Sequence, residues 1–118
     1  MNNSIRKLDN LTDKEKMAVD DLIRGLEKLY GDNLSRVILY GSKARGDSDN
    51  GSDIDIMIVV KDYKNREKEF NKISDLSYGI IVKYNYDLLL SFTLKKETEY
   101  LTRESPLMLN VRKEGIEI

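Results

Sequence analysis

The stretch from Leu39 to Val60, LYGSKARGDSDNGSDIDIMIVV, constrains the fold more than any other part of the chain. It starts at the end of an apolar strand and passes through a glycine-serine turn at Gly41 and Ser42. It closes with the run from Ile54 to Val60, whose β-favouring residues predict a strand buried on both faces. We expect the rest of the chain to hold this turn and this strand in place.

Two aspartates introduce the buried strand. Asp53 and Asp55 alternate, so both side chains project from one face, and at about 7 Å along a strand their charges repel. A divalent cation shared by both removes that repulsion. Across the turn, the N–H groups after Gly41 and the Ser42 hydroxyl suit phosphate oxygens, and Gly41 leaves the backbone open to a triphosphate. The alternative is an ordinary turn followed by aspartates at the start of a strand. The Gly-Ser turn and the aspartate pair together favour a metal and nucleotide site.

Composition narrows the chemistry. The chain has 118 residues without Cys, His or Trp, which excludes disulfides, thiol nucleophiles, Cys/His zinc sites and His-based triads. Catalysis would need carboxylates, hydroxyls, Lys, Arg and metals that prefer oxygen, chiefly Mg²⁺, with Mn²⁺ as the other candidate. A net charge of −1 offers no basic field for nucleic acid or membranes. No apolar run approaches the length needed to span a bilayer and the first residues do not begin a signal peptide, which predicts a cytoplasmic protein.

The remaining pattern predicts an α/β (α+β) fold with a mixed β-sheet flanked by helices, formed by one domain over residues 1–118. The expected elements are a helix at 13–30 behind a Thr12 capping box, strands at 34–40 and 54–60, a helical turn at 43–45 capped by Ser42, turn residues at 47–52, a helix at 65–84, a strand at 87–93, a helix at 95–101, and a C-terminal helix and tail at 105–118. Gly79 leaves an alternative, in which the helix at 65–84 ends there and a strand begins at Ile80.

The motif GSKARGDSDNGSDID resembles the nucleotidyltransferase signature of the DNA polymerase β superfamily: Gly-Ser, ten residues, then Asp-x-Asp. The chain resembles the minimal nucleotidyltransferase (MNT) proteins of prokaryotes in three features: its small size, the sequence GSKARG and the C-terminal sequence PLMLNVRKEGIEI. The signature covers about 15 residues and the broader similarity runs from Val37 onward. It implies a minimal polymerase β-like fold whose core spans 35–60.

The resemblance also implies roles for residues. Gly41 and Ser42 would hold the β and γ phosphates of ATP, while Asp53 and Asp55 would bind two Mg²⁺ ions that activate an acceptor hydroxyl. The superfamily has a third carboxylate on a neighbouring strand, and Asp87 is the candidate here; a strand-edge aspartate beside a turn is an equal alternative.

Two basic residues of the turn have two interpretations. Lys43 either contacts the triphosphate or has a structural role; the family commonly has a basic residue at this position. Arg45 could also reach the nucleotide, although bracing of the loop through Asp47 or Asp53 is favoured.

MNT proteins pair with a HEPN-type partner, often a ribonuclease toxin, and act as its antitoxin by transferring AMP to a partner tyrosine. The resemblance therefore implies a protein-AMPylating antitoxin that forms an oligomer with itself or with that partner. Two alternatives stay open: nucleotidyl transfer to a small molecule such as an aminoglycoside, and a non-catalytic module that neutralises its partner by contact.

Overall fold

The computed structural model describes residues 8–47 and 53–118, so most of the predicted turn at 47–52 lies outside the described residues. The elements are α2 (Asp13–Tyr30), η1 (Gly31–Asn33), β1 (Leu34–Tyr40), α3 (Ser42–Arg45), β2 (Ile54–Val60), α4 (Arg66–Lys83), β3 (Leu90–Lys96), α5 (Glu97–Thr102), α6 (Pro106–Glu114) and β4 (Ile116–Glu117). The helix at 13–30, the strands at 34–40 and 54–60, and the C-terminal helix are confirmed.

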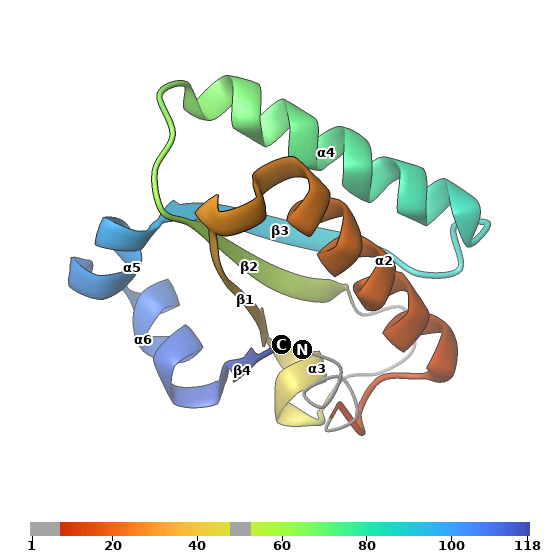
Figure 1. The fold of residues 1–118 in the computed structure, drawn as a ribbon. Coiled ribbons are helices and arrows are strands. Elements are labelled where there is room, and N and C mark those ends of the chain that lie inside the picture. Colours follow the sequence, from red (N-terminus) through yellow and green to blue (C-terminus); the bar gives the residue numbers. More distant parts are fainter. Residues whose placement is uncertain (1–7, 48–52) are drawn as a thin grey trace.

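Four strands form one mixed sheet in the order β3-β2-β1-β4 (Figure 1). β1 is antiparallel to β2 and β4, while β3 runs parallel to β2 after the α4 crossover. The register sets Tyr40 opposite Asp55 and Asp55 opposite Ser91, so these three residues form one row across the sheet. The predicted mixed sheet flanked by helices is therefore confirmed.

Helices cover both faces of the sheet, but unequally. Helices α2 and α4 lie on one face, and α5 and α6 on the other (Figure 1). The α2–α4 side holds the larger core, to which β2 contributes Ile54, Ile56, Ile58 and Val60. The α5–α6 side holds a smaller core of Ile38, Met57, Val59, Met108 and Val111. Because side chains alternate along a strand, Asp55 points to the side of the smaller core.

Helix boundaries follow the capping chemistry. Thr12 and Glu15 form the predicted capping box, with hydrogen bonds of 3.1 Å from the Glu15 N–H and 2.9 Å from the Thr12 N–H. Asn65 caps α4 by accepting from the Lys68 N–H at 3.1 Å. Helix α4 then continues through Gly79 to Lys83, which confirms the long helix and excludes a strand at Ile80.

The predicted strand at 87–93 is wrong by three residues. Asn85 is left-handed, with φ of 57°, and so is the next residue, Tyr86, with φ of 60°. Two consecutive left-handed residues prolong the turn, and the Asp87 N–H still bonds back to the Tyr84 carbonyl at 3.1 Å. The strand therefore starts only at Leu90, and the helix predicted at 95–101 shifts to Glu97–Thr102.

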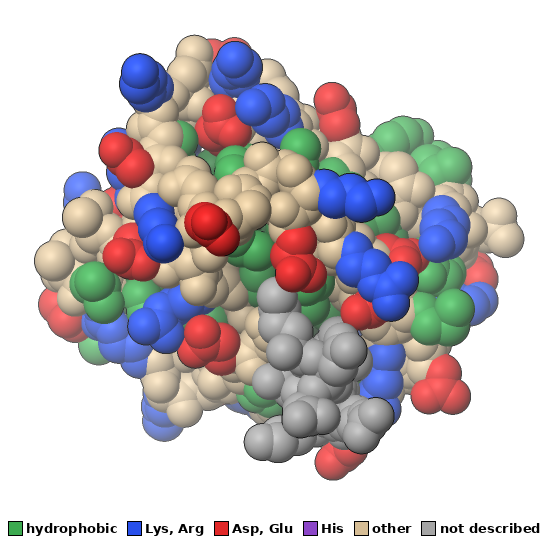
Figure 2. All heavy atoms as spheres, viewed as in Figure 1, with side chains coloured by type: hydrophobic (Ala, Val, Ile, Leu, Met, Phe, Trp, Pro, Cys, Tyr) green, Lys and Arg blue, Asp and Glu red, His purple; other side chains and the backbone are tan. Residues whose placement is uncertain are grey.

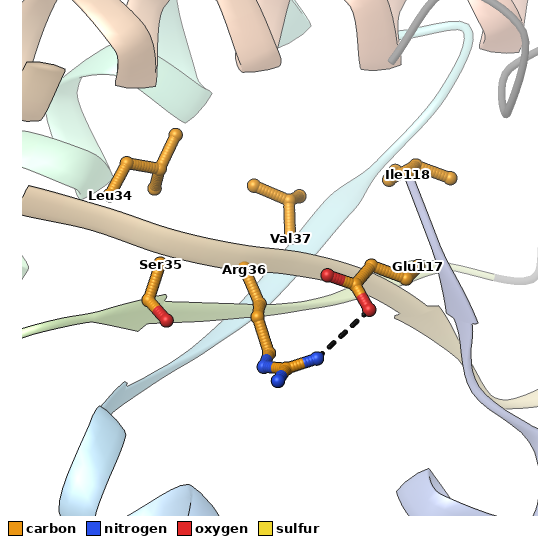
Figure 3. Close-up of a pocket in the computed structure, with 6 residues that line it drawn as sticks. All are labelled: Leu34, Ser35, Arg36, Val37, Glu117 and Ile118. Atoms are coloured by element: carbon orange, nitrogen blue, oxygen red, sulfur yellow. Dashed lines mark hydrogen bonds and ion pairs between the residues drawn. The ribbon is translucent and has the colours of Figure 1, made fainter. Parts of the chain in front are cut away.

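On the face drawn in Figure 2, acidic and basic side chains of the described residues are interspersed. A small hollow of about 150 Å³ lies at the edge of β1, lined by residues 34–37, Glu117 and Ile118 (Figure 3). It lies at the opposite end of β1 from Tyr40, the residue that pairs with Asp55, so it is separate from the predicted site. Among the described residues, no helix combines the length and apolar character that a membrane crossing requires.

Candidate active site

The turn after β1 and the start of β2 are in direct contact. Gly41 has a left-handed φ of 77°, which favours glycine. A Cβ built on Gly41 would lie 2.4 Å from the Asp55 Oδ2, so any side chain here would displace the carboxylate. The absence of a side chain at Gly41 thus brings the backbone of the turn against Asp55.

Ser42 does not cap the helical turn as predicted. The N-cap of α3 is Gly41, whose carbonyl accepts from the Ala44 and Arg45 N–H groups at 3.0 and 3.1 Å. Ser42 is already the first helical residue, and no side chain caps the turn. Its hydroxyl has no hydrogen-bond partner among the described residues. The predicted end of the turn is confirmed, because Gly46 is left-handed, with φ of 87°.

Asp53 and Asp55 form the acidic pair that the sequence predicts. Asp55 is half-buried, and Asp53 lies exposed just before β2. Burial raises the pKa of Asp55, the Asp53 charge raises it further, and the Arg45 guanidinium opposes both. Neither carboxylate has an ion-pair or hydrogen-bond partner among the described residues. The pair is therefore left with an electrostatic repulsion that the described part of the chain compensates only weakly.

A divalent cation fits this donor set. Carboxylate oxygens are the ligands that Mg²⁺ and Mn²⁺ prefer, and Mg²⁺ commonly uses one or two carboxylates plus phosphate oxygens and water. Asp53 and Asp55, which have no partner within the described part of the chain, supply two such groups, and Asp55 lies beside the turn. Within residues 8–47 and 53–118, however, no three carboxylates come close enough to form a metal site by themselves.

Asp87 does not join this pair. It lies in the loop before β3, where its carboxylate binds the Lys14 Nζ at 2.8 Å. Lys14 belongs to α2, which covers the opposite face of the sheet from the one to which Asp55 points. The residue beside Asp55 on β3 is Ser91, so the sheet register places a hydroxyl where the prediction expected a carboxylate.

The Lys43 side chain is buried and forms an ion pair. Its Nζ lies 2.9 Å from the Glu15 Oε2, and the two side chains are only 9% and 11% exposed. Burial by itself raises the pKa of Glu15, but the Thr12 N–H and the Lys43 ammonium lower it on balance. The same Glu15 thus caps α2 and anchors the turn, and this geometry favours the structural interpretation of Lys43.

Arg45 braces the loop, as favoured from the sequence. Its Nε donates to Asp47 at 3.0 Å, the predicted partner, while Asp53 is not one of its partners among the described residues. Its Nη1 donates to both carboxylate oxygens of Glu114, at 3.0 and 3.2 Å. The sequence analysis missed Glu114, because no local motif indicates a contact between residues 69 positions apart.

The fold and this site define a class of protein: a nucleotidyltransferase, with a Gly-Ser turn apposed to an Asp-x-Asp strand. The family model described as "Polymerase beta, Nucleotidyltransferase" matches residues 22–115. The chain belongs to this polymerase β nucleotidyltransferase family.

One curated protein supports this assignment, and two solved structures are similar in fold. A protein named "Putative protein adenylyltransferase" from Methanocaldococcus jannaschii is 38% identical over 86 residues, which cover 70% of this chain and 84% of the relative. The crystal structure of a nucleotidyltransferase from Sulfolobus solfataricus, titled as putative, has a TM-score of 0.55 at 22% identity and covers 82% of this chain and 74% of its own. A structure titled "toxin-antitoxin with AMP-PNP" has a TM-score of 0.53 at 18% identity and covers 83% and 70%. At these identities the two structures establish the fold alone.

Proposed function

We propose that this protein is a metal-dependent adenylyltransferase that moves AMP from ATP to a hydroxyl of a protein acceptor. The observation that carries the proposal is the contact of the Gly41 backbone with Asp55, which joins the Gly-Ser turn to the acidic pair. The name of the Methanocaldococcus relative supports AMP transfer to protein, and the AMP-PNP in a structural neighbour supports ATP as the donor.

In the proposed reaction, the acceptor oxygen attacks the α-phosphorus of ATP and forms a new phosphorus–oxygen bond. The bond from that phosphorus to the oxygen bridging the β-phosphate breaks, pyrophosphate leaves with the electron pair, and the hydroxyl proton passes to water. Gly41 and Ser42 orient the β and γ phosphates, and Asp53 and Asp55 hold divalent metal. When bound, the metal, Mg²⁺ or Mn²⁺, supplies Lewis-acid stabilisation of the charge that develops on phosphate oxygens.

The two basic residues of the turn have supporting roles in this proposal. Lys43 and Arg45 shape the turn through Glu15, Asp47 and Glu114 rather than through direct contact with phosphate. Asp87 is left out of the metal site, because its carboxylate is paired with Lys14.

The proposed acceptor is a cytoplasmic toxin partner of the HEPN type. The support is the resemblance to MNT proteins together with the toxin-antitoxin complexes among the structural neighbours. The chain would then act as an antitoxin by modifying its partner.

The test uses the purified protein, Mg²⁺ and ATP labelled at either the α or the γ phosphate, added to an extract of its own cells. Label from the α-phosphate on a protein, with release of pyrophosphate, is the expected result, and the labelled band identifies the acceptor. Label on a small molecule instead would contradict the protein acceptor. The absence of any transfer by a folded protein would contradict the proposed activity.

A further inference from the structure

One carboxylate joins the C-terminal helix to both ends of the Gly41–Arg45 turn. Glu114 is the last residue of α6, and its Oε1 accepts from the Gly41 N–H at 3.3 Å. The same carboxylate accepts from the Arg45 Nη1 through both oxygens, at 3.0 and 3.2 Å. Ser42 lies between these two contacts, so Glu114 bridges the segment that carries the serine hydroxyl.

Glu114 itself has little freedom to move. Its side chain is only 17% exposed, although its partner Arg45 is 45% exposed. The next residue, Gly115, donates its N–H to the Val111 carbonyl at 2.8 Å. A Cβ at Gly115 would lie 2.4 Å from that carbonyl oxygen and 2.8 Å from the Ile38 Cγ2, so the helix end is packed tightly against β1.

The residues after Glu114 also hold its backbone in place, through pairing in the sheet. Ile116 pairs with Leu39 in the sheet, only two residues before Gly41. The helix end and the strand pairing together hold the Glu114 backbone at a set position relative to the turn. A charged group held in this way can impose one geometry on its hydrogen-bond partners.

We propose that Glu114 is a positioning residue for the nucleotide: by fixing Gly41 and Arg45 it orients the Ser42 segment against Asp55. This inference rests on the proposed function, since it assigns Glu114 to the phosphate-binding turn. Glu114 touches neither substrate nor metal in this role. It acts through the turn, in the way that outer contacts hold the groups that bind a ligand.

The alternative role for Glu114 is competition with ATP, and it predicts a change in nucleotide affinity in the opposite direction. A carboxylate against the Gly41 N–H and a guanidinium could occupy the place of a phosphate and compete with ATP. Removing its charge would then tighten nucleotide binding, whereas removing a positioning residue weakens it.

The experiment measures binding of AMP-PNP with Mg²⁺ by calorimetry for the wild type, Glu114→Gln and Glu114→Ala. Gln keeps an acceptor for the Gly41 N–H and loses the charge that holds Arg45, while Ala loses both contacts. We expect binding about tenfold weaker for Gln and weaker again for Ala, because Gln loses only the charge-assisted contact with Arg45 and Ala loses the Gly41 contact as well. In transfer assays the KM for ATP should rise more than kcat falls.

Glu117→Gln is the matched control. Glu117 also makes an ion pair with an arginine of β1, Arg36, at 3.0 Å, and it follows Glu114 by three residues. It should leave AMP-PNP affinity unchanged, and thermal melting of every variant checks that the fold is retained.

The outcomes separate the inference from the proposed function. A wild type that binds no AMP-PNP would overturn both. A wild type that binds, with Glu114→Gln equal to it or tighter, would overturn the positioning role and leave the proposed function standing. Equal weakening by Glu117→Gln would also overturn it, because the effect would then come from general loosening of the C-terminal segment.

Discussion

At the scale of single residues, Asp53 and Asp55 carry the proposed chemistry at a cost in electrostatic repulsion. Burial and the Asp53 charge raise the pKa of Asp55, which indicates that the anionic pair is unfavourable in the apo protein. Removal of one charge should therefore affect function without damaging the fold.

We predict that Asp55→Asn lowers AMP transfer by about a hundredfold or more, because one of two protein ligands for the metal is lost. The apo protein should melt at the same temperature as the wild type or slightly higher. Transfer of α-labelled phosphate and a melting curve with and without Mg²⁺ check this, with Asp62→Asn as a control at the far end of β2. If Asp55→Asn unfolds the protein, the aspartate has a structural role that the proposed site does not include.

A second prediction concerns the Glu15–Lys43 pair. Glu15→Gln keeps the capping box but removes the charge that neutralises a lysine side chain only 9% exposed. We expect a loss of about 2 kcal/mol in the free energy of unfolding at pH 7, as for other buried charges that lose a partner.

The pH dependence of this loss has a defined sign. The pKa of Glu15 is lowered by folding, so its stabilisation is complete above its unfolded pKa and disappears as the pH falls through its folded pKa. Urea unfolding should therefore show the wild type and Glu15→Gln converging below about pH 4. Glu27→Gln, on the exposed side of α2, serves as the control and should change stability by less than about 0.5 kcal/mol. A difference that persists unchanged in acid would contradict the charge-pair explanation.

At the scale of elements, two glycines allow two effects of a glycine-to-alanine substitution on stability to be compared. One effect is the gain in helix propensity, and the other is the strain of an L side chain at a positive φ. Gly79 lies inside α4 with nothing within 4 Å of a Cβ, whereas Gly31 ends α2 at a left-handed φ of 51°, also with open space around it. We predict that Gly79→Ala raises the free energy of unfolding by about 0.5–1 kcal/mol, because alanine favours the helix.

The same substitution at Gly31 is the matched comparison. Gly31→Ala should lower the free energy of unfolding by about 1 kcal/mol, because an L side chain is strained at that φ. Chemical denaturation of both variants measures the two effects. Equal changes of one sign at both positions would show that backbone conformation does not govern them.

At the scale of the whole molecule, the sheet order decides which residues reach the site. β3 lies beside β2, and its register brings Ser91 rather than Asp87 next to Asp55. We predict that Ser91→Asp adds a third carboxylate to the pair and raises Mg²⁺ affinity several-fold, while it destabilises the metal-free protein by about 1 kcal/mol through added repulsion. Calorimetric Mg²⁺ titration and melting without metal measure these changes.

Asp87→Asn is the natural counterpart, because Asp87 is 54% exposed and paired with Lys14. It should leave Mg²⁺ affinity and transfer unchanged. A loss of metal binding in Asp87→Asn would restore the original expectation of a third metal ligand on this aspartate.

The sequence by itself determined the elements whose signals are local. Thr12 and Glu15 set the start of α2, the apolar run after Asp53 set β2, and Gly46 ended the short helical turn. It also determined the Gly-Ser and Asp-x-Asp motif, because period-two alternation alone puts Asp53 and Asp55 on one face.

Only the tertiary structure decided which distant residues meet. A second left-handed residue at Tyr86 delayed β3 and moved Asp87 away from its predicted strand, an effect that no propensity at that position signals. Glu15 and Glu114 reach Lys43 and Arg45 from helices at opposite ends of the chain, since helix packing and sheet register, not sequence spacing, set these distances. The sequence alone thus predicts the Gly-Ser and Asp-x-Asp motif. Which charged residues hold its turn in place is set only by the tertiary structure.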